Sequence, residues 1–280
     1  MRRIVRSEAI CLRVQDYHES SKLVAFFTLE QGKVTCIAKG ARRLRSKFGA
    51  ALDLFAQSRI IYYASETRTL LTLSDAELVH SFSFSRLPTP DSLSRFLAAE
   101  QMAEFALRVI QPHDPSPQLY RLLLNYLSTL ESFPLPTPSS LLPSPYPALV
   151  CSFLLKAASF LGFRPELRRC LICRRPIEST RPAYFEPIRG GITCARCAGE
   201  NPVGTRLEPA DLDTLSFLLY TPASEIASLT GSPVPRPSPP IPTPDSPIPL
   251  LDLVLGFLGH HFDPLVLNSF RWHAGLERNP

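Results

Sequence analysis

The sequence has no apolar run long enough to cross a bilayer without interruption. Its longest uncharged stretch, residues 132–155, contains six prolines, and proline inside a helix removes a backbone hydrogen bond and breaks it. An apolar leader is also missing, because the first arginines are followed by Asp16, His18 and Glu19 rather than by a hydrophobic segment. We therefore expect a cytoplasmic protein whose seven cysteines serve as thiols or metal ligands, not as disulfides.

Motifs for catalysis are missing as well. The sequence has neither a P-loop nor a paired-glycine fingerprint, so it offers no element for hydrolysing a nucleotide. None of the six histidines lies at metal-ligand spacing from the cysteines, and there is no His-x-Glu element of a zinc deaminase. The sequence thus favours a protein that is not an enzyme over its rival, a zinc-dependent enzyme.

The positive charge is confined to one part of the chain. The net charge is +5, and residues 1–80 hold 13 basic and 8 acidic residues, while the remainder holds 17 of each. The whole excess therefore lies in the first 80 residues. A localised positive field indicates a polyanionic partner more strongly than an evenly basic composition would.

The same N-terminal region reads as short strands separated by turn residues. Five segments are rich in β-branched and apolar residues, and their number and length predict a five-stranded OB-fold β-barrel over residues 1–81. Such a barrel commonly holds nucleic acid on its open face. The expected strands are residues 9–14, 22–29, 33–38, 58–63 and 70–73.

After Pro90 the hydrophobic period becomes helical. We expect a first helix from an N-cap at Ser92 to Ile110, and further helices over residues 119–130, 148–161, 212–219 and 250–262. These predict an all-α body in two parts, 82–166 and 201–280, so the chain is of the α+β multidomain class. The proline-rich segment 232–249 within the second part is expected to be an extended linker.

Four cysteines predict a metal site between the two helical parts, in an insert over residues 167–200. Cys170, Cys173, Cys194 and Cys197 form two C-x2-C pairs separated by twenty residues. Two such turns supply the tetrahedral sulfur shell that Zn²⁺ prefers, and four sulfurs leave no open position, so the zinc would be structural. The alternatives are a redox dithiol or four unrelated buried thiols. We expect Cys11, Cys36 and Cys151 to be core residues.

The cysteine insert is also rich in arginine. Residues 164–198 hold eight arginines and three acidic residues. They either contact phosphates or form the solvated surface of a small module, and the sequence leaves both interpretations open.

A basic loop follows the third expected strand. Five cations lie within residues 39–47, and a flexible cationic loop at the rim of a barrel is suited to binding a sugar-phosphate backbone. Phe48, Phe55, Tyr62 and Tyr63 are candidates for stacking on bases, although Phe55 and one tyrosine are also expected to face the barrel interior. The alternative for the cations is a merely solvated loop. The candidate DNA-binding residues are Lys39, Arg42, Arg43, Arg45 and Lys47.

Several of these segments resemble the RecO family of bacterial DNA repair and recombination mediators. The similar segments are residues 8–13, Asp16-Tyr17 with Glu19-Ser20, residues 38–43 and residues 46–50. The resemblance implies an OB-fold, binding of single- and double-stranded DNA, and annealing of complementary single strands. It also implies action with RecR to load RecA onto strands coated by the single-stranded DNA-binding protein (SSB), in the bacterial cytoplasm at the nucleoid.

The resemblance further implies that the helical body recognises the acidic C-terminal tail of SSB. Because such a tail needs a groove with basic residues at its rim, we expect Arg95, Arg108, Arg121 and Lys156 there. The alternative function is a non-enzymatic zinc-ribbon adaptor of the transcription type. That adaptor would share the four cysteines but not the basic loop on a barrel.

Overall fold

The computed structural model describes residues 3–65, 69–82, 84, 90–132, 146–178, 180–200, 202–230, 250–262, 265 and 267–270. The chain forms two compact units, which we call unit 1 (Met1–Ser132 with Leu267–Pro280) and unit 2 (Phe133–Val266). The expected linker at residues 232–249 lies outside the described residues. No helix within the described ranges is long and apolar enough to span a membrane.

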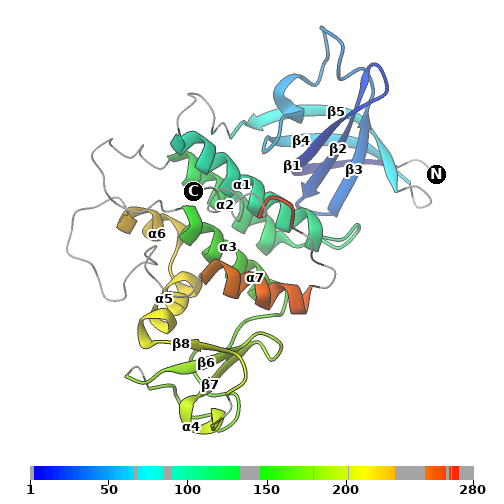
Figure 1. Cartoon of the computed structure of the whole chain (residues 1–280). Coiled ribbons are helices and arrows are strands. Elements are labelled where there is room, and N and C mark those ends of the chain that lie inside the picture. The colour runs from blue at the N-terminus through cyan, green and yellow to red at the C-terminus, as the bar shows by residue number, and fades with distance from the viewer. Residues whose placement is uncertain are drawn as a thin grey trace. The chain divides into compact units, whose positions relative to one another are not determined.

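Unit 1 begins with a closed five-stranded barrel in the order β1-β2-β3-β5-β4 (Figure 1). Neighbouring strands are antiparallel except β3 and β5, which run parallel. All five expected strands are confirmed, and the first and last extend beyond the predicted limits. Their bounds are β1 Arg3–Tyr17, β2 Ser21–Thr28, β3 Gly32–Ala38, β4 Gln57–Ala64 and β5 Leu70–His80.

The barrel closes around a small apolar core because its strands alternate inward and outward residues. In β3, Val34, Cys36 and Ala38 are buried while the residues between them are half-buried. The 3-10 helix η1, Gly49–Leu52, adds Leu52 to this core together with the preceding Phe48. The basic loop therefore lies between two segments that are fixed by burial.

Two helices follow the barrel in unit 1. Helix α1 is Pro90–Val109 and α2 is Pro117–Ser132, and each begins with proline, whose fixed φ suits the first helical turn. The predicted cap at Ser92 is wrong, because α1 starts two residues earlier and Ser92 lies in its first turn. The ring of Tyr120 in α2 packs edge-on against Phe27 in β2, with centroids 5.5 Å apart.

Unit 2 is built around one buried helix. Helix α3, Tyr146–Phe160, is apolar on nearly all sides and packs against three other helices, as its sequence predicts. The hydroxyl of Ser152 in α3 donates to the Leu218 carbonyl at 2.5 Å. The other helices are α5 Pro209–Tyr220, α6 Ala223–Thr230 and α7 Leu250–His261. The sequence did not predict α6.

A small three-stranded sheet lies between α3 and α5 in the chain. Its order is β7-β6-β8, with β6 Ala183–Glu186, β7 Gly191–Cys194 and β8 Thr205–Leu207, and a single helical turn, α4 Ala195–Ala198, follows β7. His261 at the end of α7 packs on the Phe257 ring, and its Nε2 lies 3.2 Å from the Pro187 carbonyl of the β6–β7 turn. The cysteine insert is thereby attached to the helices of unit 2.

Candidate nucleic-acid interface and metal centre

The basic loop between β3 and η1 is held in consecutive turns. The N–H of Arg43 donates to the Gly40 carbonyl at 3.1 Å, and the N–H of Ser46 donates to the Arg43 carbonyl at 3.0 Å. Gly40 has a φ of +75°, a left-handed conformation that glycine adopts without steric cost. All five candidate cations are exposed on this loop: Lys39, Arg42, Arg43, Arg45 and Lys47.

Two of the five cations fasten the loop to the barrel. The Arg42 guanidinium lies 3.3 Å from the Asp16 carboxylate and donates to the His18 carbonyl at 2.9 Å. At the other end of the loop, the Lys47 ammonium donates to the Ser74 carbonyl of β5. These contacts occupy part of the hydrogen-bonding capacity of both side chains, so both help to set the loop conformation.

The other three cations carry uncompensated charge. Among the residues that the structure describes, no carboxylate lies within 4.0 Å of Lys39, Arg43 or Arg45. Their side chains are exposed, so the charges are available to pair with an anion. The loop thus has anchors at Arg42 and Lys47, and the two guanidiniums between them, those of Arg43 and Arg45, have no carboxylate partner among the described residues.

Most of the aromatic candidates near the loop are not available to bases. Phe48 and Tyr62 are buried in the barrel core, and burial raises the pKa of Tyr62 to about 12. Phe55 is also buried, but it packs against Phe84 and against Phe96 of α1 rather than into the barrel core. Only Tyr63, which is 36% exposed, remains as a stacking candidate of the four.

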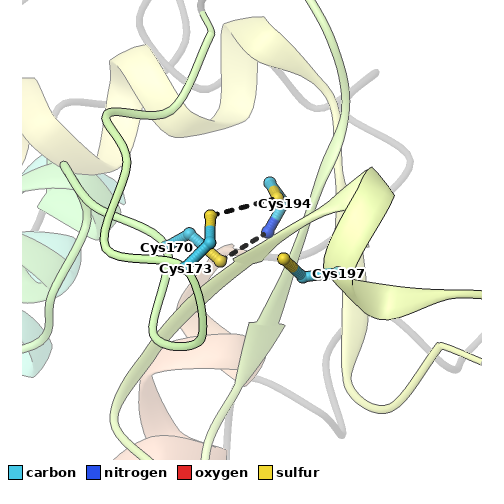
Figure 2. A group of neighbouring side chains, drawn as sticks. All are labelled: Cys170, Cys173, Cys194 and Cys197. Atoms are coloured by element: carbon cyan, nitrogen blue, oxygen red, sulfur yellow. Dashed lines mark hydrogen bonds between the residues drawn. The ribbon is translucent and has the colours of Figure 1, made fainter.

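The four predicted cysteine ligands lie together in unit 2 with their sulfurs directed toward a common point (Figure 2). All four Sγ atoms lie within 4.8 Å of one another, and those of Cys173 and Cys194 are 4.0 Å apart. It is the one such cluster of potential metal ligands within the described ranges. The spacing prediction that these cysteines come together is confirmed.

The chain brings the two pairs together through two tight turns. In the first, the N–H of Arg174 donates to the Cys170 carbonyl at 2.9 Å, and Arg174 takes a left-handed φ of +60°. In the second, Cys194 ends β7 and Cys197 lies in α4. At the start of β7, a Cβ on Gly191 would lie 2.8 Å from the Leu171 side chain and 3.0 Å from the Glu166 carbonyl oxygen, so glycine suits the close approach of these segments.

The protonation of the cluster reflects its hydrogen bonds. Burial raises the pKa of Cys170, but backbone N–H groups, first that of Cys194 at 3.4 Å, outweigh burial and lower the pKa to about 6. Hydrogen bonding to the Cys194 sulfur raises the pKa of Cys197 to about 12. Of these two thiols, Cys170 is therefore the more acidic.

The geometry suits a tetrahedral metal ion. With a Zn–S bond of about 2.3 Å, the sulfurs of a tetrahedral site lie about 3.8 Å apart, close to the separations in this cluster. The remaining cysteines are core residues as predicted: Cys11, Cys36 and Cys151 are buried, and burial raises each thiol pKa to about 12.

Two of the four basic residues expected at the rim of an SSB-tail groove are engaged elsewhere. Arg95 is buried, pairs with Asp91 at 2.8 Å and donates to the Leu130 carbonyl at 3.2 Å. The Lys156 ammonium donates to the Thr221 carbonyl. Arg108 and Arg121 are exposed on α1 and α2.

Comparison with known proteins identifies the family. The models described as Recombination protein O N terminal and Recombination protein O C terminal match residues 1–82 and 90–236. The chain belongs to the RecO family. The RecO resemblance seen in the sequence motifs is confirmed, and with it a role in DNA repair and recombination.

Three relatives named DNA repair protein RecO span most of the chain. The protein from Anaeromyxobacter sp. (strain K) is 32% identical over 234 residues, which cover 84% of this chain and 85% of the relative. The Symbiobacterium thermophilum protein is 33% identical over 213 residues, with coverages of 76% and 78%. The Rubrobacter xylanophilus protein is 33% identical over 229 residues, with coverages of 81% and 86%.

Proposed function

We propose that this RecO-family protein binds DNA on an OB-fold barrel through the basic loop and anneals complementary single strands. The observation that carries the proposal is the loop itself, in which Arg43 and Arg45 hold uncompensated charge on a backbone fixed by Arg42 and Lys47. The closed barrel order β1-β2-β3-β5-β4 supports the OB-fold assignment.

Annealing by such a surface needs no covalent chemistry. Neutralising the phosphates of two strands lowers their mutual repulsion, and base pairing and stacking then supply the driving force. The protein acts as a mediator and not as an enzyme. Its partners in this proposal are RecR, the SSB tail and, indirectly, RecA, which it helps to load on SSB-coated strands in the cytoplasm.

The four-cysteine cluster serves this function as a structural centre. Cys170, Cys173, Cys194 and Cys197 would hold one Zn²⁺, which supplies a cross-link between two turns. Because four sulfurs fill the tetrahedral shell, the site leaves no position for a substrate. The insert limits proposed from the sequence, residues 167–200, enclose all four ligands.

The zinc-ribbon adaptor is the less favoured function. A transcription-type ribbon accounts for the cysteines alone, whereas the two RecO models match residues on both sides of them, including the whole barrel. The basic loop also has no role in that alternative.

The test is annealing of complementary oligonucleotides without ATP, together with DNA affinity as a function of salt. Each phosphate neutralised on a single strand contributes a slope of about −0.7 in log affinity against log salt. Replacing Arg42, Arg43 and Arg45 by Ala should flatten the slope by at least about 1.4 units, for the two phosphates that Arg43 and Arg45 contact, and should slow annealing for any base sequence. An unchanged slope and rate in the triple variant would show that the loop is only solvated.

A further inference from the structure

Unit 2 contains a cluster of two arginines around one tyrosine that the proposed function does not use. Tyr220 is the last residue of α5, and the guanidinium carbons of Arg164 and Arg168 lie 5.1 Å and 4.4 Å from its ring centroid. Both distances are within the range of cation–π attraction. We call these three residues the Tyr220 cluster.

The cluster lies among arginines that are largely uncompensated. All eight arginines of residues 164–198 are exposed, and only Arg181 and Arg189 pair with carboxylates, those of Glu178 and Glu186. The nearby Glu166 carboxylate accepts the backbone N–H groups of Arg168 and Arg169 instead of pairing with their side chains. Within the described residues, Arg164 and Arg168 therefore have no ion-pair partner.

A purely structural role does not account for the arrangement. Cations often neutralise the carbonyl end of a helix, but at the end of α5 the Lys156 ammonium already donates to the Thr221 carbonyl. The arginines also do not bury the ring, since Tyr220 remains 39% exposed. Two guanidiniums over a tyrosine ring that remains partly exposed, with no carboxylate partner among the described residues, are the elements of a surface that binds single-stranded nucleic acid.

We propose that the Tyr220 cluster is a second site for single-stranded DNA, separate from the basic loop. Arg164 and Arg168 would pair with phosphates through their forked donors, and the Tyr220 ring would stack on a base. An acidic peptide could use the arginines but has no base to stack on the ring. The inference rests on the proposed DNA binding by the barrel, and it gives the molecule one site for each of the two strands that annealing brings together.

The experiment measures whether one protein holds two strands that cannot pair. Oligo(dT) labelled with a donor dye and oligo(dT) labelled with an acceptor are mixed with the full-length protein, and energy transfer reports capture of both. We expect transfer with the wild type and its loss in the double variant R164A/R168A, which should still bind one strand by fluorescence anisotropy. In the wild type, the two phosphate contacts should give capture of the second strand a salt slope of about −1.4.

Matched variants distinguish an effect of the Tyr220 cluster from a general effect of removing positive charge. Arg175 and Arg196 are exposed arginines of the same unit with no ring contact in the described structure, so R175A/R196A removes the same charge and should keep the transfer. Tyr220→Phe should keep it as well, whereas Tyr220→Leu should weaken it. Light-induced cross-linking of 5-iododeoxyuridine oligonucleotides to Tyr220 in the wild type tests the contact without any variant.

The outcomes distinguish this inference from the proposed function. If the wild type binds no oligo(dT) at all, the proposed function fails. If it binds one strand but R164A/R168A still brings two together, or if R175A/R196A loses the transfer equally, the Tyr220 cluster is not the second site. Loss of acidic-peptide binding in R164A/R168A with unchanged transfer would overturn the inference in favour of a peptide site.

Discussion

At the scale of single residues, the arginines of the basic loop divide into an anchor and two free cations. Arg43→Ala with Arg45→Ala should flatten the salt slope of single-strand affinity by about 1.4, because two phosphate contacts are lost. Arg42→Ala should change the slope less and lower the thermal midpoint, since its ion pair with Asp16 and its bond to His18 hold the loop. That side chain is 38% exposed, so the stability cost should not exceed about 1 kcal/mol. Equal slopes in the two variants would contradict this division.

Lys156 should make the stability of unit 2 depend on pH in the alkaline range. Burial lowers its pKa from 10.5 to about 8. Between these values the unfolded chain binds more protons than the folded one, so the contribution of Lys156 to the free energy of unfolding rises with pH. We expect chemical denaturation at several pH values in this window to give a free energy of unfolding that rises with pH more for the wild type than for Lys156→Met. A constant difference would mean that the ammonium is not desolvated.

At the scale of elements, the β2–β3 turn is fitted to the connection between α1 and α2. Gly32 has a φ of +65°, and a Cβ there would lie 2.4 Å from the carbonyl oxygens of Gln111 and Asp114. Gly32→Ala should therefore destabilise the protein by at least about 2 kcal/mol, since backbone atoms must move. Gly49→Ala is the control, because Gly49 also has a positive φ but no atom within 4 Å of the added Cβ. If Gly32→Ala and Gly49→Ala have the same denaturant midpoint, the close fit around Gly32 is refuted.

Removal of the proposed zinc should lower the stability of the protein before it lowers the DNA affinity. We expect about one zinc per chain by metal analysis of freshly purified protein, and a lower zinc content in Cys170→Ser. Because a closed sulfur shell contributes to folding rather than to binding, Cys170→Ser should lower the thermal midpoint while barrel-dependent DNA binding persists. If metal analysis finds no zinc in the purified protein, or if Cys170→Ser leaves the zinc content unchanged, the four cysteines do not form a zinc site.

The elements that the sequence predicts well are those with a strong hydrophobic period. The barrel strands and helices α2, α3 and α7 follow from such periods. The sequence did not predict the short strands β6 and β8 or helix α6, because elements of three to eight residues carry too little hydrophobic pattern. The cluster of four cysteines follows from spacing alone. In contrast, the anchoring of Arg42 by Asp16 and the stacking of Arg164 and Arg168 on Tyr220 join residues far apart in sequence. No local pattern encodes such pairs.

At the scale of the whole molecule, charge and partner sites are divided between the units. The excess positive charge and the basic loop belong to unit 1, whereas the arginine-rich cysteine insert belongs to unit 2. Under the proposed function, unit 1 holds DNA through this excess charge, and unit 2 does not need to be basic overall. The helices of unit 1 also carry two exposed cations, Arg108 and Arg121.

Recognition of the SSB tail should depend on those exposed cations and not on the buried ones. Arg108, which pairs loosely with Glu104 at 3.9 Å, and Arg121 are exposed, whereas Arg95 is fixed between Asp91 and the Leu130 carbonyl. An exposed pairing contributes about 0.2–1 kcal/mol, so losing two pairings in Arg108→Ala with Arg121→Ala should weaken binding of the acidic tail peptide by roughly two- to thirtyfold at low salt. Calorimetry of the full-length protein measures this, and the difference should shrink as salt screens the charges. Arg95→Ala should instead lower the thermal midpoint, because Asp91 then lacks this partner. Tail affinity that is unchanged in the double variant would place the binding surface elsewhere, and no tail binding by the wild type at low salt would refute recognition of the tail.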